Sequence, residues 1–234
     1  MALTWTRREP QHRPALAPAA RPAGDDTLER LLALVNNKDR PLQFVFAGKA
    51  HPQDDPGKEI LREVVRRAES PEFRGRVVFL PEYDMGIARA LVAGCDVWLN
   101  NPIRPHEASG TSGMKSAMNG GLNLSVRDGW WDEAPHEEAG FVIGDPVDES
   151  LGEDAGTALY EALEEKVIPL FFDRDENGIP WRWLEKMVFS AKQIARAFSS
   201  DRMMMEYLEQ CYLPAAERRD AMNGARAKQL VEGI

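Results

Sequence analysis

The stretch that decides the fold is LQFVFAGKAHPQDDPGKEILREVVRRAESPEFRGRVVFLP, residues 42–81. Its start, LQFVFAG, is a short apolar run that ends at glycine, which is typical of a buried strand. The middle, PGKEILREVVRRAES, has proline and glutamate near its start, apolar residues such as Ile60, Leu61 and Val64 on one face, and arginines toward its end, as a helix favours. The last run, RVVFLP, is again typical of a strand. Together they predict two parallel strands joined by a right-handed helical crossover.

The same alternation continues on both sides of this unit. Upstream, from Asp26, an acidic first turn and leucines such as Leu28 and Leu31 predict a helix. Downstream, we expect a helix in MGIARALVAGC, a strand in DVWLNN, a glycine-rich loop with a short helix around Met114–Met118, and a strand in LNLSV. The fold class is therefore α/β, with a Rossmann-like parallel sheet covered by helices in residues 26–150.

The two ends of the chain have other compositions. Residues 1–25 are rich in proline, alanine and arginine, a mixture that supports neither a helix nor a strand, so we expect a disordered leader. From residue 151 onward strand signals give way to helical ones, as in IPWRWLEKMVFSAKQIARAF. We expect residues 151–234 to form a helical region packed on the sheet domain.

Charge and cysteine content exclude several classes of protein. The formal net charge is −9 over 234 residues, which argues against nucleic-acid binding, because a basic face is needed to neutralise phosphates. Cys95 and Cys211 lie far apart, so we interpret them as reduced packing residues of a cytoplasmic protein. The histidines lack ligand spacing, and no run of 18 apolar residues occurs. We therefore expect neither a metal site nor a membrane association.

The loop EASGTSGMKSAMNGG, residues 107–121, combines features of a ligand site. It follows a predicted strand, and ligands of parallel sheets collect at the carboxyl ends of strands. Its glycines allow close approach of the backbone, its hydroxyls can donate to a phosphate or a sugar, and Glu107 can accept from sugar hydroxyls. The small residues are Ser109, Gly110, Thr111, Ser112 and Gly113. The pattern fits an anion or polyol site, and it also fits an ordinary helix N-terminus.

Lys115 and a tryptophan pair each allow two interpretations. The neighbours Met114, Ala117 and Met118 predict that the helix of Lys115 packs into the core, and a desolvated lysine suits a covalent bond to an aldehyde cofactor. A solvated side chain is the alternative. The pair Trp130–Trp131 could stack on sugar rings, yet adjacent residues point in different directions, so we expect at least one to pack in the core.

Three segments resemble one enzyme family. The run NNPIRPHEASGTSGMKSAMNGGLNLSVRDGWWDEA, residues 100–134, resembles the pyridoxal-phosphate lysine segment of the α-glucan (glycogen, starch, maltodextrin) phosphorylases. FVFAGKAHPQDDPGK, residues 44–58, resembles the glycine-lysine loop of the compact bacterial branch, and FSSDRMMMEYLEQCYLP, residues 198–214, resembles the terminal helix. The resemblance implies the carboxyl-terminal half of a GT-B type glycosyltransferase fold, whose active-site cleft lies against an amino-terminal half that this chain does not contain.

The resemblance also implies an activity: phosphorolysis of the terminal α-1,4 bond of a glucan, which yields glucose 1-phosphate. Lys115 would hold pyridoxal 5'-phosphate and act through this cofactor. The cofactor phosphate would lie against Thr111, Ser112 and Gly113. The terminal glucose would bind Glu107, Ser109 and Gly110. The partners implied are an α-1,4-glucan, inorganic phosphate, and the missing half or a second chain. We expect a cytoplasmic enzyme without allosteric regulation, able to form homo-oligomers through the exposed half-cleft.

Two departures from the family affect this interpretation. Upstream of residue 40 the family carries a basic tyrosine-lysine-arginine motif that binds substrate phosphate, whereas this chain has TWTRREPQHRPALAPAARPAG, with only Arg7 and Arg8 near the start. Two phosphates without these cations would repel each other, so we expect the chain alone to be inactive. Asp84 stands where many longer members have an arginine. The alternatives are a non-catalytic remnant that binds cofactor or glucan, and a half-domain of a nucleotide-sugar glucosyltransferase.

Overall fold

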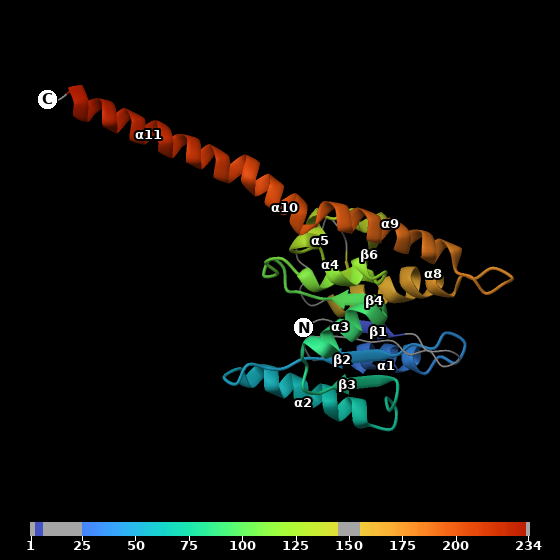
Figure 1. Cartoon of the computed structure of the whole chain (residues 1–234). Helices are drawn as coiled ribbons and strands as arrows, with labels where there is room; N and C mark the ends of the chain where they lie inside the picture. The colour runs from blue at the N-terminus through green and yellow to red at the C-terminus, as the bar shows by residue number, and fades with distance from the viewer. Residues whose placement is uncertain (1–2, 7–24, 145–154, 233–234) are drawn as a thin grey trace. The chain divides into compact units, whose positions relative to one another are not determined.

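The computed structural model describes residues 3–6, 25–144 and 155–232, and its centre is a six-stranded sheet (Figure 1). The strands follow the order β3-β2-β1-β4-β5-β6 across the sheet. They are β1 (Leu3–Thr6), β2 (Phe44–Ala47), β3 (Val77–Leu80), β4 (Cys95–Asn100), β5 (Leu122–Ser125) and β6 (Gly140–Val142). This is the spatial strand order of doubly wound dinucleotide-binding sheets, and the chain continues from β2 toward one edge of the sheet and from β4 toward the other, so that a topological switch point lies between β2 and β4.

Most strand pairs have the predicted direction. β2 pairs with β3, β4 with β5, and β5 with β6, all in parallel, with Phe44 opposite Val77 and Val97 opposite Leu122. The α/β class and the strands predicted around residues 42–48, 76–81 and 122–126 are therefore confirmed.

Strand β1 differs from the prediction. It runs antiparallel to both β2 and β4, with Leu3 opposite Phe46 and Leu99, so the expectation of a wholly parallel sheet is wrong at its centre. The expected disordered leader also does not describe these four residues, and residues 7–24 lie outside the described part of the chain. The physical reason is that the facing edges of β2 and β4 need backbone partners, and an extended segment of either direction supplies them.

The first helices cover the sheet, and two of them begin at a capping aspartate. In Figure 1 α2 lies beside β3 and α4 beside β4. These helices are α1 (Asp25–Val35), α2 (Asp55–Glu69), α3 (Met85–Gly94), α4 (Thr111–Met118), α5 (Trp130–Glu133) and α6 (His136–Ala139). Asp84 caps α3 by accepting the backbone N–H of Ile87 at 2.8 Å. Asp84 therefore begins a helix here.

The later helices are α7 (Ala155–Glu161), η1 (Ala162–Val167), α8 (Ile168–Phe172) and α9 (Trp181–Ala197). They pack on the sheet unit: the Trp183 ring stacks on that of Phe141 of β6 with centroids 5.9 Å apart, and Arg30 of α1 pairs with Glu164 at 2.8 Å. The compact unit consequently extends to Ile194, well beyond the boundary predicted at residue 150. Residues 145–154 lie outside the described part.

Two π-helical segments share one sequence feature. η1 ends at Val167, two residues before Pro169, and η2 (Leu208–Tyr212) ends two residues before Pro214. Proline has no N–H to donate to the carbonyl four residues earlier, so the preceding turn can widen. The residue before each proline donates instead to a carbonyl five residues back, Ile168 to Leu163 and Leu213 to Leu208.

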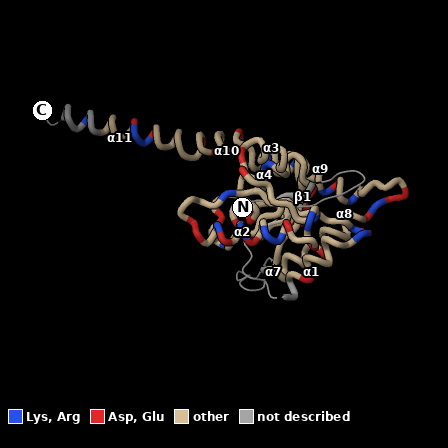
Figure 2. The backbone as a smooth tube through the Cα atoms, turned by 90° about the horizontal axis from the view of Figure 1, so that it is seen from below, with Lys and Arg blue, Asp and Glu red and all other residues tan. Residues whose placement is uncertain are grey.

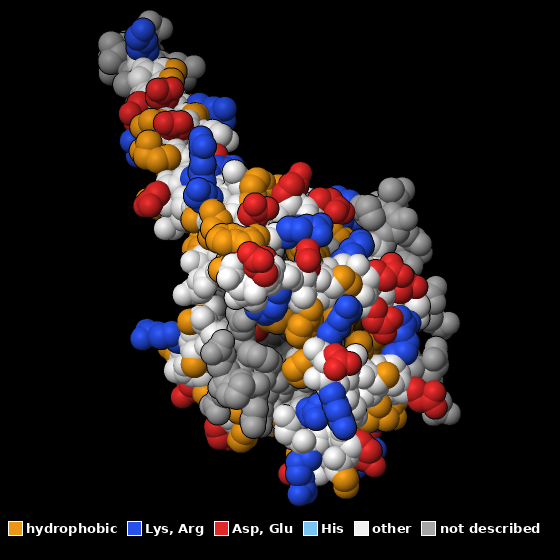
Figure 3. All heavy atoms as spheres, turned by 90° about the vertical axis from the view of Figure 1, so that its right-hand side faces the viewer, with side chains coloured by type: hydrophobic (Ala, Val, Ile, Leu, Met, Phe, Trp, Pro, Cys, Tyr) orange, Lys and Arg blue, Asp and Glu red, His pale blue; other side chains and the backbone are white. Residues whose placement is uncertain are grey.

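Residues 195–234 form a second compact unit, which contains α10 (Ser200–Tyr207), η2 and α11 (Leu213–Glu232). Ser199 caps α10 by accepting the N–H of Arg202 at 3.2 Å, and Arg202 pairs with Glu206 at 2.7 Å. Several large apolar side chains of this unit are exposed, and Figure 3 shows hydrophobic side chains gathered on it. They are Met203, Met204, Met205, Tyr207, Leu208, Tyr212, Leu213 and Met222.

Basic and acidic residues are interspersed along the described part of the chain (Figure 2). Within the same described residues, no helix is both long and apolar enough to cross a membrane.

Candidate ligand site at the sheet switch point

The candidate site lies where the loops after β2, β4 and β5 leave the sheet. β4 and β5 are parallel neighbours, so their carboxyl ends and the loops that follow them share one edge. β4 also borders the switch point between β2 and β4, and ligands of doubly wound sheets bind at such points. The glycine-rich loop predicted as a ligand site follows β4 directly and leads into α4.

The start of α4 has no side-chain cap, and its buried side packs closely against Asn123 and Trp130. Its N-cap residue is Gly110, and no side chain caps the helix. Gly113 is buried, and a Cβ on it would lie 2.5 Å from Oδ1 of Asn123 and 2.9 Å from Cζ2 of Trp130. Asn123, which is 1 % exposed, also donates from Nδ2 to the Gly113 carbonyl at 3.1 Å. Only glycine lets the helix start come this close to β5 and the indole.

Lys115 lies on the exposed side of α4. The buried face of the helix is formed by Gly113, Ser116 and Ala117, and Ser116 Oγ lies 3.2 Å from Cys95 Sγ of β4. The Lys115 Nζ instead donates to Thr111 Oγ1 at 3.4 Å, one turn earlier. Of the two interpretations left open for Lys115, the structure has the solvated side chain, because Lys115 lies outside the buried face formed by Gly113, Ser116 and Ala117.

The residues predicted for a sugar lie beside the helix start. Glu107 is half-buried, and its carboxyl carbon is 3.6 Å from the position that a Cβ on Gly110 would take. Ser109 is exposed, and its carbonyl accepts the backbone N–H of Trp130 at 2.9 Å. One loop therefore brings a carboxylate and a hydroxyl next to the open end of α4.

The tryptophan pair belongs to the core. Trp130 is 5 % exposed and Trp131 is fully buried, with ring centroids 5.1 Å apart in an edge arrangement. The core-packing interpretation is confirmed, and Trp130 also supports the site, since its indole lies under Gly110 and Gly113. Sequence reasoning missed this supporting role because nothing in the residue order links Trp130 to the loop.

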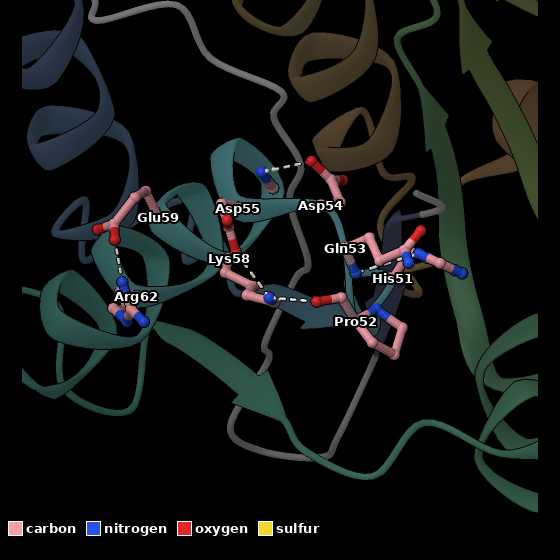
Figure 4. A network of polar contacts seen from close by, with 9 residues as sticks. His51, Pro52, Gln53, Asp54, Asp55, Lys58, Glu59 and Arg62 are labelled. Atoms are coloured by element: carbon pink, nitrogen blue, oxygen red, sulfur yellow. Dashed lines mark hydrogen bonds and ion pairs between the residues drawn. The ribbon is translucent and has the colours of Figure 1, made fainter.

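A second loop, after β2, carries Gly48 and Lys49. Lys49 Nζ lies 3.5 Å from Glu82 Oε2 in an exposed pair, which contributes little to stability. The rest of the loop is held at the start of α2 (Figure 4): Asp54 accepts the N–H of Gly57 at 2.9 Å, and Lys58 Nζ donates to Asp55 at 2.8 Å and to the Pro52 carbonyl. The described residues contain no cluster of His, Cys, Asp and Glu that could hold a metal ion.

The fold and loop define an α/β protein with a candidate ligand site at the switch point of a doubly wound sheet. Residues 27–149 match the family model described as carbohydrate phosphorylase, and the chain belongs to this family. Its relatives are glycosyltransferases of carbohydrate metabolism.

Individual relatives are similar over most of this chain. A glycogen phosphorylase of Mycobacterium bovis is 50% identical over 202 residues, which are 84% of this chain and 23% of the relative. A maltodextrin phosphorylase of Thermococcus litoralis is 50% identical over 192 residues, 80% of this chain and 22% of the relative. A glycogen phosphorylase of Aquifex aeolicus is 46% identical over 186 residues, 79% of this chain and 27% of the relative. The chain thus spans about a quarter of the length of these relatives.

Proposed function

We propose that this chain supplies the cofactor side of an α-glucan phosphorylase. It binds pyridoxal 5'-phosphate at Lys115 and the terminal glucose of an α-1,4-glucan at Glu107–Gly110, and the complete enzyme cleaves the terminal bond with phosphate to release glucose 1-phosphate. The observation that carries the proposal is the placement of Lys115 Nζ and Thr111 Oγ1, 3.4 Å apart on one face of α4, in a chain that is 50% identical to a glycogen phosphorylase.

The residues at the start of α4 fit this cofactor, which carries a phosphate and an aldehyde. Helix N-termini attract anions because their first N–H groups lack acceptors. The Thr111 hydroxyl and the backbone N–H of Ser112 would hold the phosphate, since the described residues offer Ser112 N–H no acceptor. The N–H of Gly113 already donates to the Gly110 carbonyl at 3.1 Å. Gly113 would lie against the phosphate by leaving room for it, since a Cβ there would meet Asn123 and Trp130.

Lys115 would anchor the aldehyde through its amine. The amine is exposed and reaches back along α4 toward Thr111, the direction in which the phosphate would lie. When bound, the cofactor supplies a phosphate group that exchanges a proton with the substrate phosphate. Lys115 and Thr111 fix the position of that group beside the sugar-binding residues.

The sugar-binding half of the site is formed by the loop before α4. The Glu107 carboxylate would accept hydrogen bonds from sugar hydroxyls, because an ionised carboxylate is an acceptor only. Ser109 would add a donor, since its carbonyl is occupied by Trp130 and its side chain is exposed. Arg7 and Arg8, the candidates for substrate-phosphate contacts, lie outside the described residues. We propose that catalysis requires further phosphorylase residues from an amino-terminal portion.

Reductive trapping tests the cofactor assignment. The chain is incubated with pyridoxal phosphate, reduced with borohydride and digested, and the labelled peptide is mapped. The proposal expects the label on Lys115 and its loss in Lys115→Ala. Lys49→Ala is the matched control, because Lys49 is an exposed lysine on another loop of the sheet, and it should retain the label. Equal labelling of many lysines, or none at saturating cofactor, would contradict the proposal.

Turnover is tested separately. The labelled chain is mixed with the amino-terminal portion of a related glycogen phosphorylase, maltoheptaose and phosphate, and glucose 1-phosphate is measured. Release of glucose 1-phosphate that depends on Lys115 supports a phosphorylase part. Specific labelling without any release would favour the second candidate, a chain that binds cofactor without turnover.

A further inference from the structure

Asp128, between β5 and α5, is a buried carboxylate to which sequence reasoning gave no role. It is 7 % exposed, and both of its oxygens accept backbone N–H groups: Oδ2 from Glu107 and Oδ1 from Gly129, each at 2.9 Å. A buried carboxylate is costly unless it is hydrogen-bonded, and bonds to a charged acceptor are stronger than neutral ones. Asp128 therefore ties the loop after β5 to the first residue of the sugar-binding loop.

Further contacts join the same two segments. The backbone N–H of Trp130 donates to the Ser109 carbonyl at 2.9 Å. Gly129 has φ +54°, and a Cβ on it would lie 2.6 Å from the Ser109 carbonyl oxygen. The backbones of the two loops thus lie close together at the residues that follow Asp128, and its carboxylate accepts an N–H from each loop.

The cofactor half of the loop has a different support. Asn123 of β5 donates to the Gly113 carbonyl at 3.1 Å, and Ser116 contacts Cys95 of β4 at 3.2 Å. Neither contact involves Asp128. The two halves of the site therefore rest on separate buried polar side chains, Asn123 under α4 and Asp128 under Glu107.

We propose that Asp128 is a positioning residue for sugar binding, a proposal that rests on the function given above. Its carboxylate fixes the backbone of Glu107, and through it the Glu107 side chain beside Gly110, without touching the ligand. Asparagine cannot replace it, because its amide has one acceptor oxygen and presents an N–H₂ donor to the second backbone N–H.

The test replaces the acid by its amide at Asp128 and the amide by its acid at Asn123, the two buried residues that support the two halves of the site. Asp128→Asn weakens the sugar half, and Asn123→Asp, which turns a carboxylate oxygen toward the Gly113 carbonyl, weakens the cofactor half. Amide hydrogen exchange is followed by NMR at Glu107 and Gly129 without any ligand. Lys115 labelling by pyridoxal phosphate and glucose-induced shifts of the Glu107 and Gly110 amides are then measured in the loaded chain.

We expect Asp128→Asn to accelerate exchange of the Glu107 amide about tenfold and to weaken glucose binding about tenfold, because one charge-assisted hydrogen bond is lost. Its Lys115 labelling should stay within about twofold of the wild type, a change smaller than the loss of a single hydrogen bond would cause. Asn123→Asp should show the reverse pattern. If Asp128→Asn does not fold, Asp128→Ser, which keeps one acceptor, takes its place.

Unchanged exchange at Glu107 would overturn the role of Asp128, and so would an equal loss of labelling in both variants. Absence of the Lys115 label in the wild type would instead overturn the proposed function, and the exchange measurement would still report on the contact itself. Absence of glucose shifts in a labelled wild type would overturn sugar positioning alone.

Discussion

Lys115 Nζ lies 3.4 Å from Thr111 Oγ1, one turn earlier on α4. The helix therefore presents an amine and a hydroxyl on one exposed face at its open N-terminus. In the proposed function, the amine would bind the aldehyde of the cofactor and the open helix N-terminus would bind its phosphate.

Thr111→Val should weaken cofactor binding. The substitution keeps the shape of the side chain and removes the hydroxyl that faces Lys115. We expect the apparent affinity for pyridoxal phosphate, measured as Lys115 labelling against cofactor concentration, to fall about tenfold through loss of one bond to a charged group. Thr111→Ser should restore most of it. If the valine variant binds pyridoxal phosphate with the affinity of the wild type, Thr111 does not contact the phosphate.

Gly113→Ala should destabilise the fold. The new methyl would meet Asn123 Oδ1 at 2.5 Å and Trp130 Cζ2 at 2.9 Å. Both neighbours are buried, so the strain should cost about 1–3 kcal/mol in the free energy of unfolding, measured with urea. Gly94→Ala is the control, because nothing lies within 4 Å of a Cβ there, and it should be neutral or slightly stabilising.

Asp84→Arg should also reduce stability. It removes the carboxylate that accepts the Ile87 N–H at 2.8 Å. Loss of an N-cap typically costs about 1 kcal/mol. Asp84→Asn keeps an acceptor and should stay near the wild-type midpoint in urea unfolding. An arginine variant as stable as the wild type would show that the cap contributes nothing.

Tyr160 should make stability fall at alkaline pH. Burial raises the pKa of its hydroxyl to about 12, although Arg30 acts to lower it. The unfolded chain, with a pKa of about 10, loses the proton first, so it binds fewer protons than the folded state and stability decreases as the pH rises. The loss begins near the unfolded pKa and is complete above the folded one, about 12.

The size of this effect is roughly 2–3 kcal/mol, because each pKa unit corresponds to about 1.4 kcal/mol. Urea unfolding from about pH 9, one unit below the unfolded pKa, to about pH 12, the folded pKa, should show most of the decrease in the wild type. Tyr160→Phe cannot ionise and should show a smaller decrease over the same range. Parallel curves for the two proteins would refute the assignment to Tyr160.

The residue order alone identified the elements whose signals are local. The strand at residues 42–48 ends at glycine, and α2 begins with an acidic cap and Pro56 and ends in arginines, so each is specified within its own segment. The position of the glycine-rich loop after β4 was equally local. The candidate site residues of this loop could therefore be named from the residue order, although their roles remain proposals.

Contacts between distant segments were decided only by the tertiary structure. The direction of β1 depends on the two strand edges that it joins, and the exposure of Lys115 depends on which face of α4 meets Cys95 and Asn123. Asp128 lies 21 positions from Glu107 in the chain, and its part in the loop exists only because β4 and β5 are neighbours. The sequence determines local elements through hydrophobic periodicity and caps, whereas the partner of a buried polar group is set by the packing of the whole sheet.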